Sequence, residues 1–180
     1  MRNIVIVALI AIAATVSTGH AADWVLEGST ITYFVSHPLH HVDGISHSAK
    51  GKGVCRNKWC DFLIAVPVNT FDSGDSNRDL HMLQVTRGGK FPMITVRASL
   101  PEDLKGATIA ADLEVGFAGQ TTHYLQVPFQ RVDQGDQSRI KGTIPLKISD
   151  FKIDPPMLLA VPIKDSVPIT VDMNWRKRNP

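Results

Sequence analysis

The sequence predicts an all-β protein with one short helix, whose strands form a single antiparallel barrel or sandwich. Three observations lead to this prediction: apolar and polar residues alternate over most of the chain, short turns separate the alternating segments, and the length suits one domain. The clearest alternation places Ile109, Ala111, Leu113, Val115 and Phe117 on one face of a strand. About eight strands of this kind can surround an interior that is filled by side chains or holds one small ligand.

The strands follow one another along the chain with a single interruption. We expect the first four near residues 29–37, 46–55, 60–68 and 92–100, with the helix near 77–86 between the last two. Alternation of the same period then predicts strands in the segments 109–117, 125–129, 140–148 and 167–175.

Four prolines fall inside these segments, namely Pro67, Pro128, Pro145 and Pro168. Proline cannot donate a hydrogen bond to a neighbouring strand, so it prefers the edge of a sheet or a bulge. We therefore expect bulges that curve the wall, and an incompletely closed barrel remains the alternative.

The amino terminus has the pattern of a cleaved signal peptide. Arg2 precedes an apolar run from Ile4 to Val16, and Gly19-His20-Ala21 places small residues at the two positions that signal peptidase reads. The run is short for a membrane span. We expect residues 1–21 to be removed and residues 22–180 to form one mature domain in the periplasm, with no transmembrane segment.

The charge of the mature chain argues against nucleic acid as a partner. Removal of the signal leaves 18 basic and 17 acidic side chains, a net charge of +1. Nucleic-acid-binding proteins need a clustered basic surface, which this balance does not indicate.

The two cysteines, Cys55 and Cys60, are separated by four residues, a common length for a hairpin loop. As the closing cross-strand pair of that hairpin they would lie close enough for a disulfide, which an oxidising compartment favours. A redox or soft-metal pair is the competing interpretation, although the spacing is not that of C-x-x-C motifs.

Several motifs resemble those of the YceI-like family. The segment Asn69–Arg97 joins a polar loop, the helical turn Asn77-Arg78-Asp79-x-His81 and the strand entry Lys90-Phe91-Pro92. The opening strand from Trp24 to His37, the turn Ser149–Ile153 and the closing strand Val167–Trp175 are similar to the family pattern as well. Two departures stand out: the hairpin Gly116–Thr121 differs from the family's usual Gly-Val-Thr, and Lys152 replaces a glycine.

This resemblance implies a secreted, lipocalin-like β-barrel that holds an isoprenoid or another long-chain lipid, for transport or sequestration, without catalysis. It is also compatible with a homodimer. The sequence adds no motif of a hydrolase, a P-loop or a dinucleotide site, so we expect no enzyme activity, no cofactor and no catalytic residue.

The alternation also predicts which residues face the ligand. Counting in steps of two places His37 on the face of Tyr33 and Val35, and His123 on the face of Leu125 and Val127. Each histidine would be a polar group at one end of an apolar interior, as a lipid with a polar head requires. The predicted interior set is Tyr33, Val35, His37, Leu113, Val115, Phe117, His123, Leu125, Val127 and Phe129.

The helix supplies two rim candidates, Arg78 and His81. An arginine at the mouth of a barrel can pair with a phosphate head group. The alternative is structural: Arg78 and Asp79 would pin the helix to the barrel rim, and a histidine at a strand end would be a hydrogen-bonded core or rim residue.

A periplasmic metal-binding or redox-stress role is the main alternative function. His37, His40, His41 and His47 lie within eleven residues, and imidazole is a frequent ligand of zinc and copper. Because adjacent histidines point apart in an extended chain and no recognised metal spacing is present, we favour lipid binding and expect no metal site.

Overall fold

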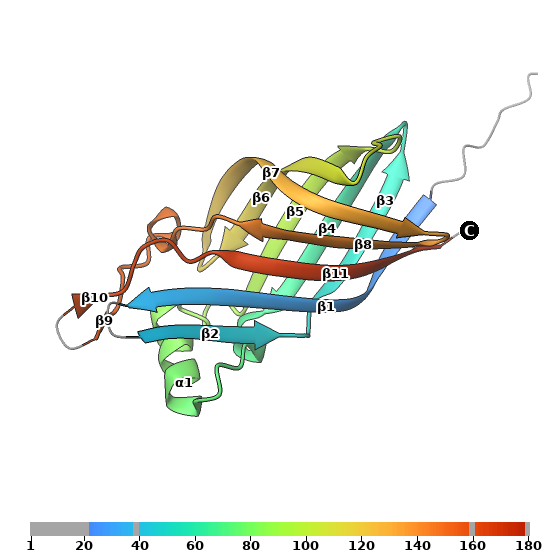
Figure 1. Ribbon diagram of the computed structural model, residues 1–180. Helices are drawn as coiled ribbons and strands as arrows, with labels where there is room; N and C mark the ends of the chain where they lie inside the picture. Colours follow the sequence, from blue (N-terminus) through green and yellow to red (C-terminus); the bar gives the residue numbers. More distant parts are fainter. Residues whose placement is uncertain (1–21, 38–39, 159–160, 179–180) are drawn as a thin grey trace, which may run out of the picture.

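The computed structural model describes residues 22–37, 40–158 and 161–178. Its strands form a closed antiparallel barrel of eight strands, in which β1 pairs with both β11 and β3, and this confirms the predicted fold class (Figure 1). The short strand β2 pairs with the carboxyl-terminal half of β1, from Ile31 to His37, as a ninth strand of the sheet. The strands of the sheet are β1 (Ala22–His37), β2 (His40–Ser46), β3 (Lys50–Arg56), β4 (Trp59–Pro67), β5 (Met93–Pro101), β6 (Thr108–Phe117), β7 (Gln120–Gln134), β8 (Gln137–Ile144) and β11 (Ile169–Arg178).

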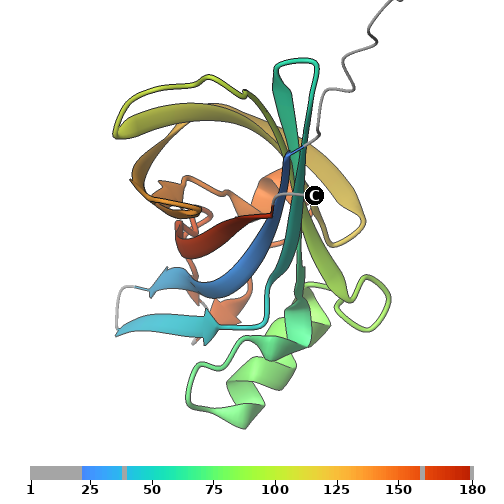
Figure 2. The same ribbon diagram turned by 90° about the vertical axis from the view of Figure 1, so that its right-hand side faces the viewer.

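The remaining elements lie at one end of the barrel. The α-helix α1 (Ser76–Val85) follows the short 3-10 helix η1 (Val68–Thr70), and a second 3-10 helix, η2 (Ile148–Phe151), follows β8. The two-residue strands β9 (Met157–Leu158) and β10 (Val161–Pro162) pair with each other. Figure 2 shows the curvature of the barrel strands, with α1 below them.

Two predicted strands extend over several residues that are not in a strand, and two others are longer than predicted, since β1 begins at Ala22 and β7 runs from Gln120 to Gln134. The segment 46–55 is not one strand, because β2 ends at Ser46 and β3 begins at Lys50. These two strands pair with different halves of β1, so the chain turns a corner between them. The segment 140–148 ends as a strand at Ile144, although Leu146 and Ile148 stay buried beyond it.

The prolines mark ends of strands more often than bulges. Pro67 is the last residue of β4, Pro145 follows β8, and Pro168 precedes β11. Only Pro128 lies within a strand beside a bulge, in the middle of β7. The prediction of bulges was therefore correct at one proline and wrong at the other three.

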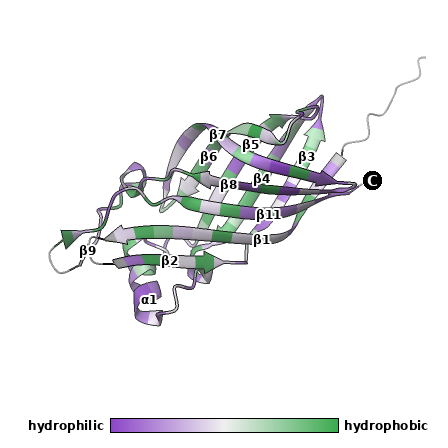
Figure 3. Cartoon of the chain, viewed as in Figure 1, coloured by the Kyte–Doolittle hydropathy of each residue, from purple (hydrophilic) through white to green (hydrophobic). Residues whose placement is uncertain are grey.

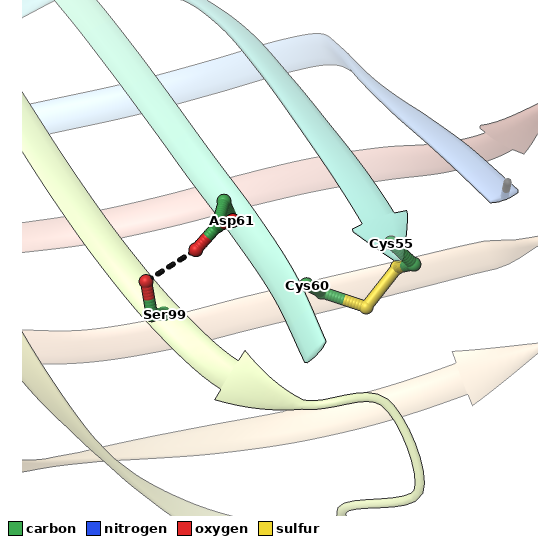
Figure 4. Close-up of a disulfide and its surroundings, with 4 residues drawn as sticks. All are labelled: Cys55, Cys60, Asp61 and Ser99. Carbon is green, nitrogen blue, oxygen red and sulfur yellow. Dashed lines mark hydrogen bonds between the residues drawn. A yellow bond between two sulfur atoms is a disulfide. The ribbon is translucent and has the colours of Figure 1, made fainter. Parts of the chain in front are cut away.

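The cysteines form the predicted disulfide, which joins the ends of β3 and β4 (Figure 4). The hairpin loop is shorter than expected, because Arg56 and Trp59 still pair and only Asn57 and Lys58 form the turn. Both turn residues have positive φ angles of 52° and 68°, as a two-residue type I′ turn requires. The disulfide therefore lies one pair inside the end of the hairpin.

Alternation along the strands produces the core. Inward side chains of the barrel strands form one hydrophobic cluster, while α1 is mainly hydrophilic, as the colouring of Figure 3 shows. Phe151 of η2 is fully buried and stacks edge-to-face with Phe117 of β6, with ring centroids 5.4 Å apart. This contact fixes the loop after β8 against the end of the barrel that α1 occupies.

Lys152 provides a test of backbone strain at a departure from the family pattern. It ends η2 with φ 54° and ψ 41°, a left-handed conformation that costs a non-glycine residue about 1 kcal/mol or more. We expect Lys152→Gly to raise the free energy of unfolding by about 1 kcal/mol, measured by urea denaturation. The control is Lys147→Gly, an exposed lysine with φ −115°, where glycine should lower stability. Equal effects of the two substitutions would contradict the strain argument.

Candidate functional site

The interior of the barrel contains a cavity of about 900 Å³. This volume lies near the upper end of the range for small-molecule sites in proteins. The wall is predominantly apolar, because the inward residues of successive strands are aliphatic or aromatic. On β4, β5 and β6 these wall residues are Cys60, Phe62, Ile64, Val66, Ile94, Val96, Ala98, Leu100, Ile109, Ala111, Leu113 and Val115.

The cavity extends along most of the barrel. Four successive inward residues of β4, from Cys60 to Val66, line it, and these six residue steps span roughly 20 Å of strand. At one end it reaches Met82 and Val85 of α1, and at the other it reaches the disulfide hairpin. A long, narrow molecule matches this shape better than a compact one.

Aromatic rings leave the interior open because they lie over glycines of the neighbouring strands. A Cβ atom on Gly53 would lie 2.4 Å from the ring of Phe62, and one on Gly142 would lie 2.4 Å from the ring of Phe129. Each glycine is paired across the sheet with the strand residue whose ring covers it. The missing side chains let both rings rest against the wall instead of filling the barrel.

Most of the residues predicted from the sequence line this cavity. They are Tyr33, Val35, Arg78, His81, Leu113, Val115, Phe117 and Phe129. Val127 is buried in the core but is not part of the cavity wall. The side chain of His37 lies outside what the structure describes, and only its backbone pairing with His40 is seen. That any of these residues binds a ligand stays a prediction.

His123 and Leu125 do not face the interior, so their predicted inward position was wrong. Leu125 is 72% exposed, and His123 is exposed as well. The reason is a β-bulge in β7, where Ala111 pairs with Val127 but Leu113 pairs with Tyr124. An extra residue reverses the alternation on one side of a bulge. The alternation that places Val127 and Phe129 inward therefore does not extend to the residues before the bulge.

The bulge is stabilised by Asp112 of β6. Gln126 adopts a positive φ of 54°, and its backbone N–H donates to a carboxylate oxygen of Asp112 at 2.7 Å. The side-chain amide of Gln126 donates to the same oxygen at 2.9 Å. Pro128, which the sequence placed inside a strand, was the signal of this bulge.

The residue that takes the inward place near the bulge is Tyr124. Its hydroxyl donates a hydrogen bond to Asp150 at 3.0 Å, and partial burial together with this bond raises the pKa of the phenol above its usual range. This hydrogen bond connects β7 to η2 and uses the hydroxyl hydrogen of Tyr124.

The α1 rim is organised by internal hydrogen bonds. Asp75 caps the helix by accepting from the backbone N–H groups of Asn77 and Arg78. The guanidinium of Arg78 donates from Nε to Ser73 Oγ at 2.9 Å and from Nη2 to the Ser73 carbonyl at 2.7 Å. Asp79 accepts from the N–H and hydroxyl of Ser73. These bonds pin α1 to the loop that precedes it, not to the barrel rim that the prediction named, and they occupy two donor nitrogens of Arg78.

Tyr33 lies at the same end of the cavity. Its ring contacts Phe71, with centroids 5.7 Å apart, and burial is the main cause that raises the pKa of its hydroxyl. His81 of α1 is exposed at the rim.

A polar cluster that was not predicted from the sequence lies at the opposite end of the cavity. Arg131 and Asp133 of β7 form an ion pair of 3.2 Å, and Ser138 of β8 donates to Asp133 at 2.7 Å. All three line the cavity. Arg131 points inward like Val127 and Phe129, because it follows them in steps of two along β7. A predicted strand two residues longer would therefore have included it.

The metal alternative stays a prediction, because the side chains of His37 and His40 lie outside what the structure describes. Among the side chains that are described, no group of three or more His, Cys, Asp or Glu is placed to hold an ion. His40 and His41 belong to β2 rather than to a loop, and His47 Nδ1 hydrogen-bonds with Thr30 and the Ser29 carbonyl. The described residues also include no helix long and apolar enough to cross a membrane.

Comparisons with known proteins agree with this architecture. The model of the YceI-like domain matches residues 24–175. No curated protein matches the chain. Among solved structures, Burkholderia cenocepacia BcnA is similar with a TM-score of 0.69 at 15% identity, over 81% of this chain and 95% of that one.

Two further solved structures share the fold. A polyisoprenoid binding domain from Saccharophagus degradans, implicated in plant cell wall breakdown, has a TM-score of 0.68 at 12% identity, over 87% of this chain and 98% of that one. A Campylobacter jejuni YCEI protein has a TM-score of 0.53 at 14% identity, over 67% of this chain and 72% of that one. At these identities the likeness shows the fold alone.

The pinning role of Arg78 can be tested on the helix. We expect Arg78→Ala to lower the free energy of unfolding by about 1 kcal/mol, because Ser73 loses two hydrogen bonds to a charged group at a partly exposed site. Amide hydrogen exchange of residues 76–85 should accelerate. Gln84→Ala, an exposed change on the same helix, is the control. Unchanged exchange in the Arg78 variant would argue against pinning.

Proposed function

The chain belongs to the YceI-like family, and on this basis we propose that it binds an isoprenoid lipid, or another long apolar molecule, inside its barrel. The proposed role is to sequester or carry this molecule in the periplasm after export. The observation that carries the proposal is the apolar cavity of about 900 Å³ along the barrel axis.

The energetics of the cavity support such a ligand. Burial of each methylene group contributes about 0.8 kcal/mol, so a tail that lies against the wall of β4 to β6 gains substantial affinity without specific bonds. Since burial supplies this binding free energy, the proposal assigns no chemical step to the protein. The likeness to a polyisoprenoid binding domain is a second, weaker support, because it rests on the fold.

The first test is to extract the ligand. Mature protein is purified from the periplasm of a Gram-negative host without denaturation, and solvent extracts are analysed by mass spectrometry beside native mass spectrometry of the same sample. We expect a stoichiometric long-chain species. Protein that is empty, and that takes up no long-chain lipid when it is offered, would contradict the proposal.

Export gives a separate prediction. The strand β1 already includes Ala22, the residue expected to follow the signal peptide. We expect the periplasmic protein to begin at Ala22, as intact mass measurement or amino-terminal sequencing would show. A cytoplasmic protein that retains residues 1–21 would refute the periplasmic part of the proposal and leave lipid binding to be judged separately.

A cavity-filling substitution tests where the ligand lies. Ala111 of β6 lines the cavity, so the ring of Ala111→Phe should enter it and reduce uptake of a long-chain lipid severalfold. The neighbouring Ala110 is exposed on the outer face, and Ala110→Phe is a matched control with the same added ring. Circular dichroism should show that both variants are folded. Equal uptake by folded Ala111→Phe and wild-type protein would exclude binding at this part of the interior.

A further inference from the structure

The outer side of the hairpin formed by β3 and β4 is exposed and rich in cations. Cβ atoms on Gly51 and Gly53 would meet side chains of the barrel interior, so the residues that alternate with them point outward. The hairpin itself extends beyond the neighbouring strands (Figure 2). We define the hairpin face as the exposed cations and large apolar residues on this side: Lys50, Lys52, Arg56, Lys58, Trp59 and Leu63.

Each large apolar side chain of the hairpin face has a cation beside it. Trp59 is 53% exposed and pairs across the hairpin with Arg56. Leu63 is 45% exposed and lies between Lys52 on β3 and Arg97 on β5. Directly opposed residues of an antiparallel pair have their Cβ atoms about 5 Å apart. Apolar and cationic groups are therefore interleaved on one surface.

The four cations of the hairpin face are not neutralised by ion pairs. None of them forms a salt bridge with any residue that the structure describes. On the opposite side of the barrel, by contrast, Arg139 and Lys141 of β8 both pair with Asp172 of β11. The positive charge of the hairpin face thus remains available to a partner.

The carboxylates near the hairpin face are fewer than its cations. Asp61 lies on the same side of β4 and accepts a hydrogen bond from the hydroxyl of Ser99 on β5 (Figure 4). Asp23 of β1 lies beside β3, opposite Val54. Four cations against two carboxylates leave an excess of positive charge on this outer side.

The turn that follows β5 does not reverse this excess. It adjoins the tip of the hairpin, because the backbone N–H of Glu102 donates to the carbonyl of Lys58 at 2.8 Å. The side chain of Glu102 lines the end of the cavity. The other two charges of this turn, on Asp103 and Lys105, balance each other.

A membrane surface with anionic phospholipids matches both properties of the hairpin face. Lysine and arginine are attracted to negatively charged head groups, and their apolar stems can lie along the interfacial region. Tryptophan is enriched at this interface because its ring is apolar and its N–H is polar. A soluble polyanion would pair with the cations but would offer no hydrocarbon to Trp59 and Leu63. A second copy of the hairpin face would carry the same excess of positive charge.

The disulfide prepares the tip of the hairpin for such a contact. Cys55 and Cys60 are joined one residue pair inside Arg56 and Trp59, which close the two-residue turn. A cross-link at this place holds the two strands together near the exposed tip. Less conformational freedom is then lost when Arg56 and Trp59 bind a partner.

We propose that the hairpin face binds the surface of membranes that contain anionic phospholipids. Trp59 enters the interface between head groups and hydrocarbon, while Lys52 and Arg56 bind lipid phosphates. The inference concerns the outside of the barrel, so it goes beyond the proposed function and does not depend on what the cavity holds.

The test measures binding of the mature protein to vesicles by sedimentation. One set of vesicles is phosphatidylcholine alone, and the other contains phosphatidylcholine with increasing fractions of phosphatidylglycerol. We expect binding that rises with the phosphatidylglycerol fraction and weakens as salt is added, because salt screens exposed charges. No binding to phosphatidylglycerol vesicles at low ionic strength would overturn the proposal.

A charge reversal locates the contact. Each cation at an anionic surface contributes about fivefold to the affinity, so Lys52→Glu combined with Arg56→Glu should weaken binding by more than about tenfold. The matched control is Lys147→Glu combined with Lys164→Glu, which changes the net charge equally at exposed positions toward the α1 end. Circular dichroism establishes that both double variants are folded. Equal losses in the two would overturn the assignment to the hairpin face.

The apolar part of the contact has its own variant. Trp59→Ala should weaken binding to phosphatidylglycerol vesicles severalfold, whereas Leu125→Ala, a loss of an exposed apolar side chain on β7, should leave it unchanged. Wild-type protein that binds the soluble polyanion heparin but no vesicles would assign the hairpin face to an acidic partner instead. Equal binding to vesicles with and without phosphatidylglycerol would likewise contradict the proposal.

Discussion

The architecture depends on the pairing of β1 with strands on both of its sides. Residues Asp23 to Tyr33 pair with β11, while the first four residues of β1 pair with β3. This double pairing joins the two ends of the sheet, so the eight strands enclose a space instead of packing against a second sheet. Closure also satisfies the backbone groups that an open edge would leave unpaired. The enclosed interior and its two different ends follow from this one constraint.

The second determinant is the amount of space that closure leaves. A barrel of eight strands has an interior that side chains can fill, so an open cavity needs a specific cause. Here small residues on the wall, such as Ala98 and Ala111, and rings that lie over Gly53 and Gly142 supply it. A larger residue at either glycine would push its aromatic partner inward. The same residue types that weaken isolated strands therefore keep the interior available.

Much of this structure was predictable from the sequence, and the failures have identifiable physical causes. Alternation located the strands that form the wall, and the Cys55–Cys60 spacing located the disulfide, because both signals are local. The division between β2 and β3 was not local, since it depends on which half of β1 each strand meets. His123 and Leu125 were misplaced because one bulge reverses the alternation, and its partner Asp112 lies on another strand. Arg131 was missed because the expected strand stopped at Phe129.

The distribution of polar groups decides how selective such a cavity can be. An apolar wall rewards any buried tail in proportion to its area, so it distinguishes ligands by length and shape and not by functional group. Discrimination between functional groups then has to come from polar residues at the ends. At the α1 end Arg78, Asp75 and Asp79 are bonded to their own loop and helix, which stabilises the rim but leaves the arginine little capacity for a ligand. At the disulfide end Arg131 lines the cavity and forms an ion pair with Asp133. The two ends of the cavity therefore differ in how their polar side chains are engaged: at the α1 end they are bonded within their own loop and helix, and at the disulfide end they line the cavity.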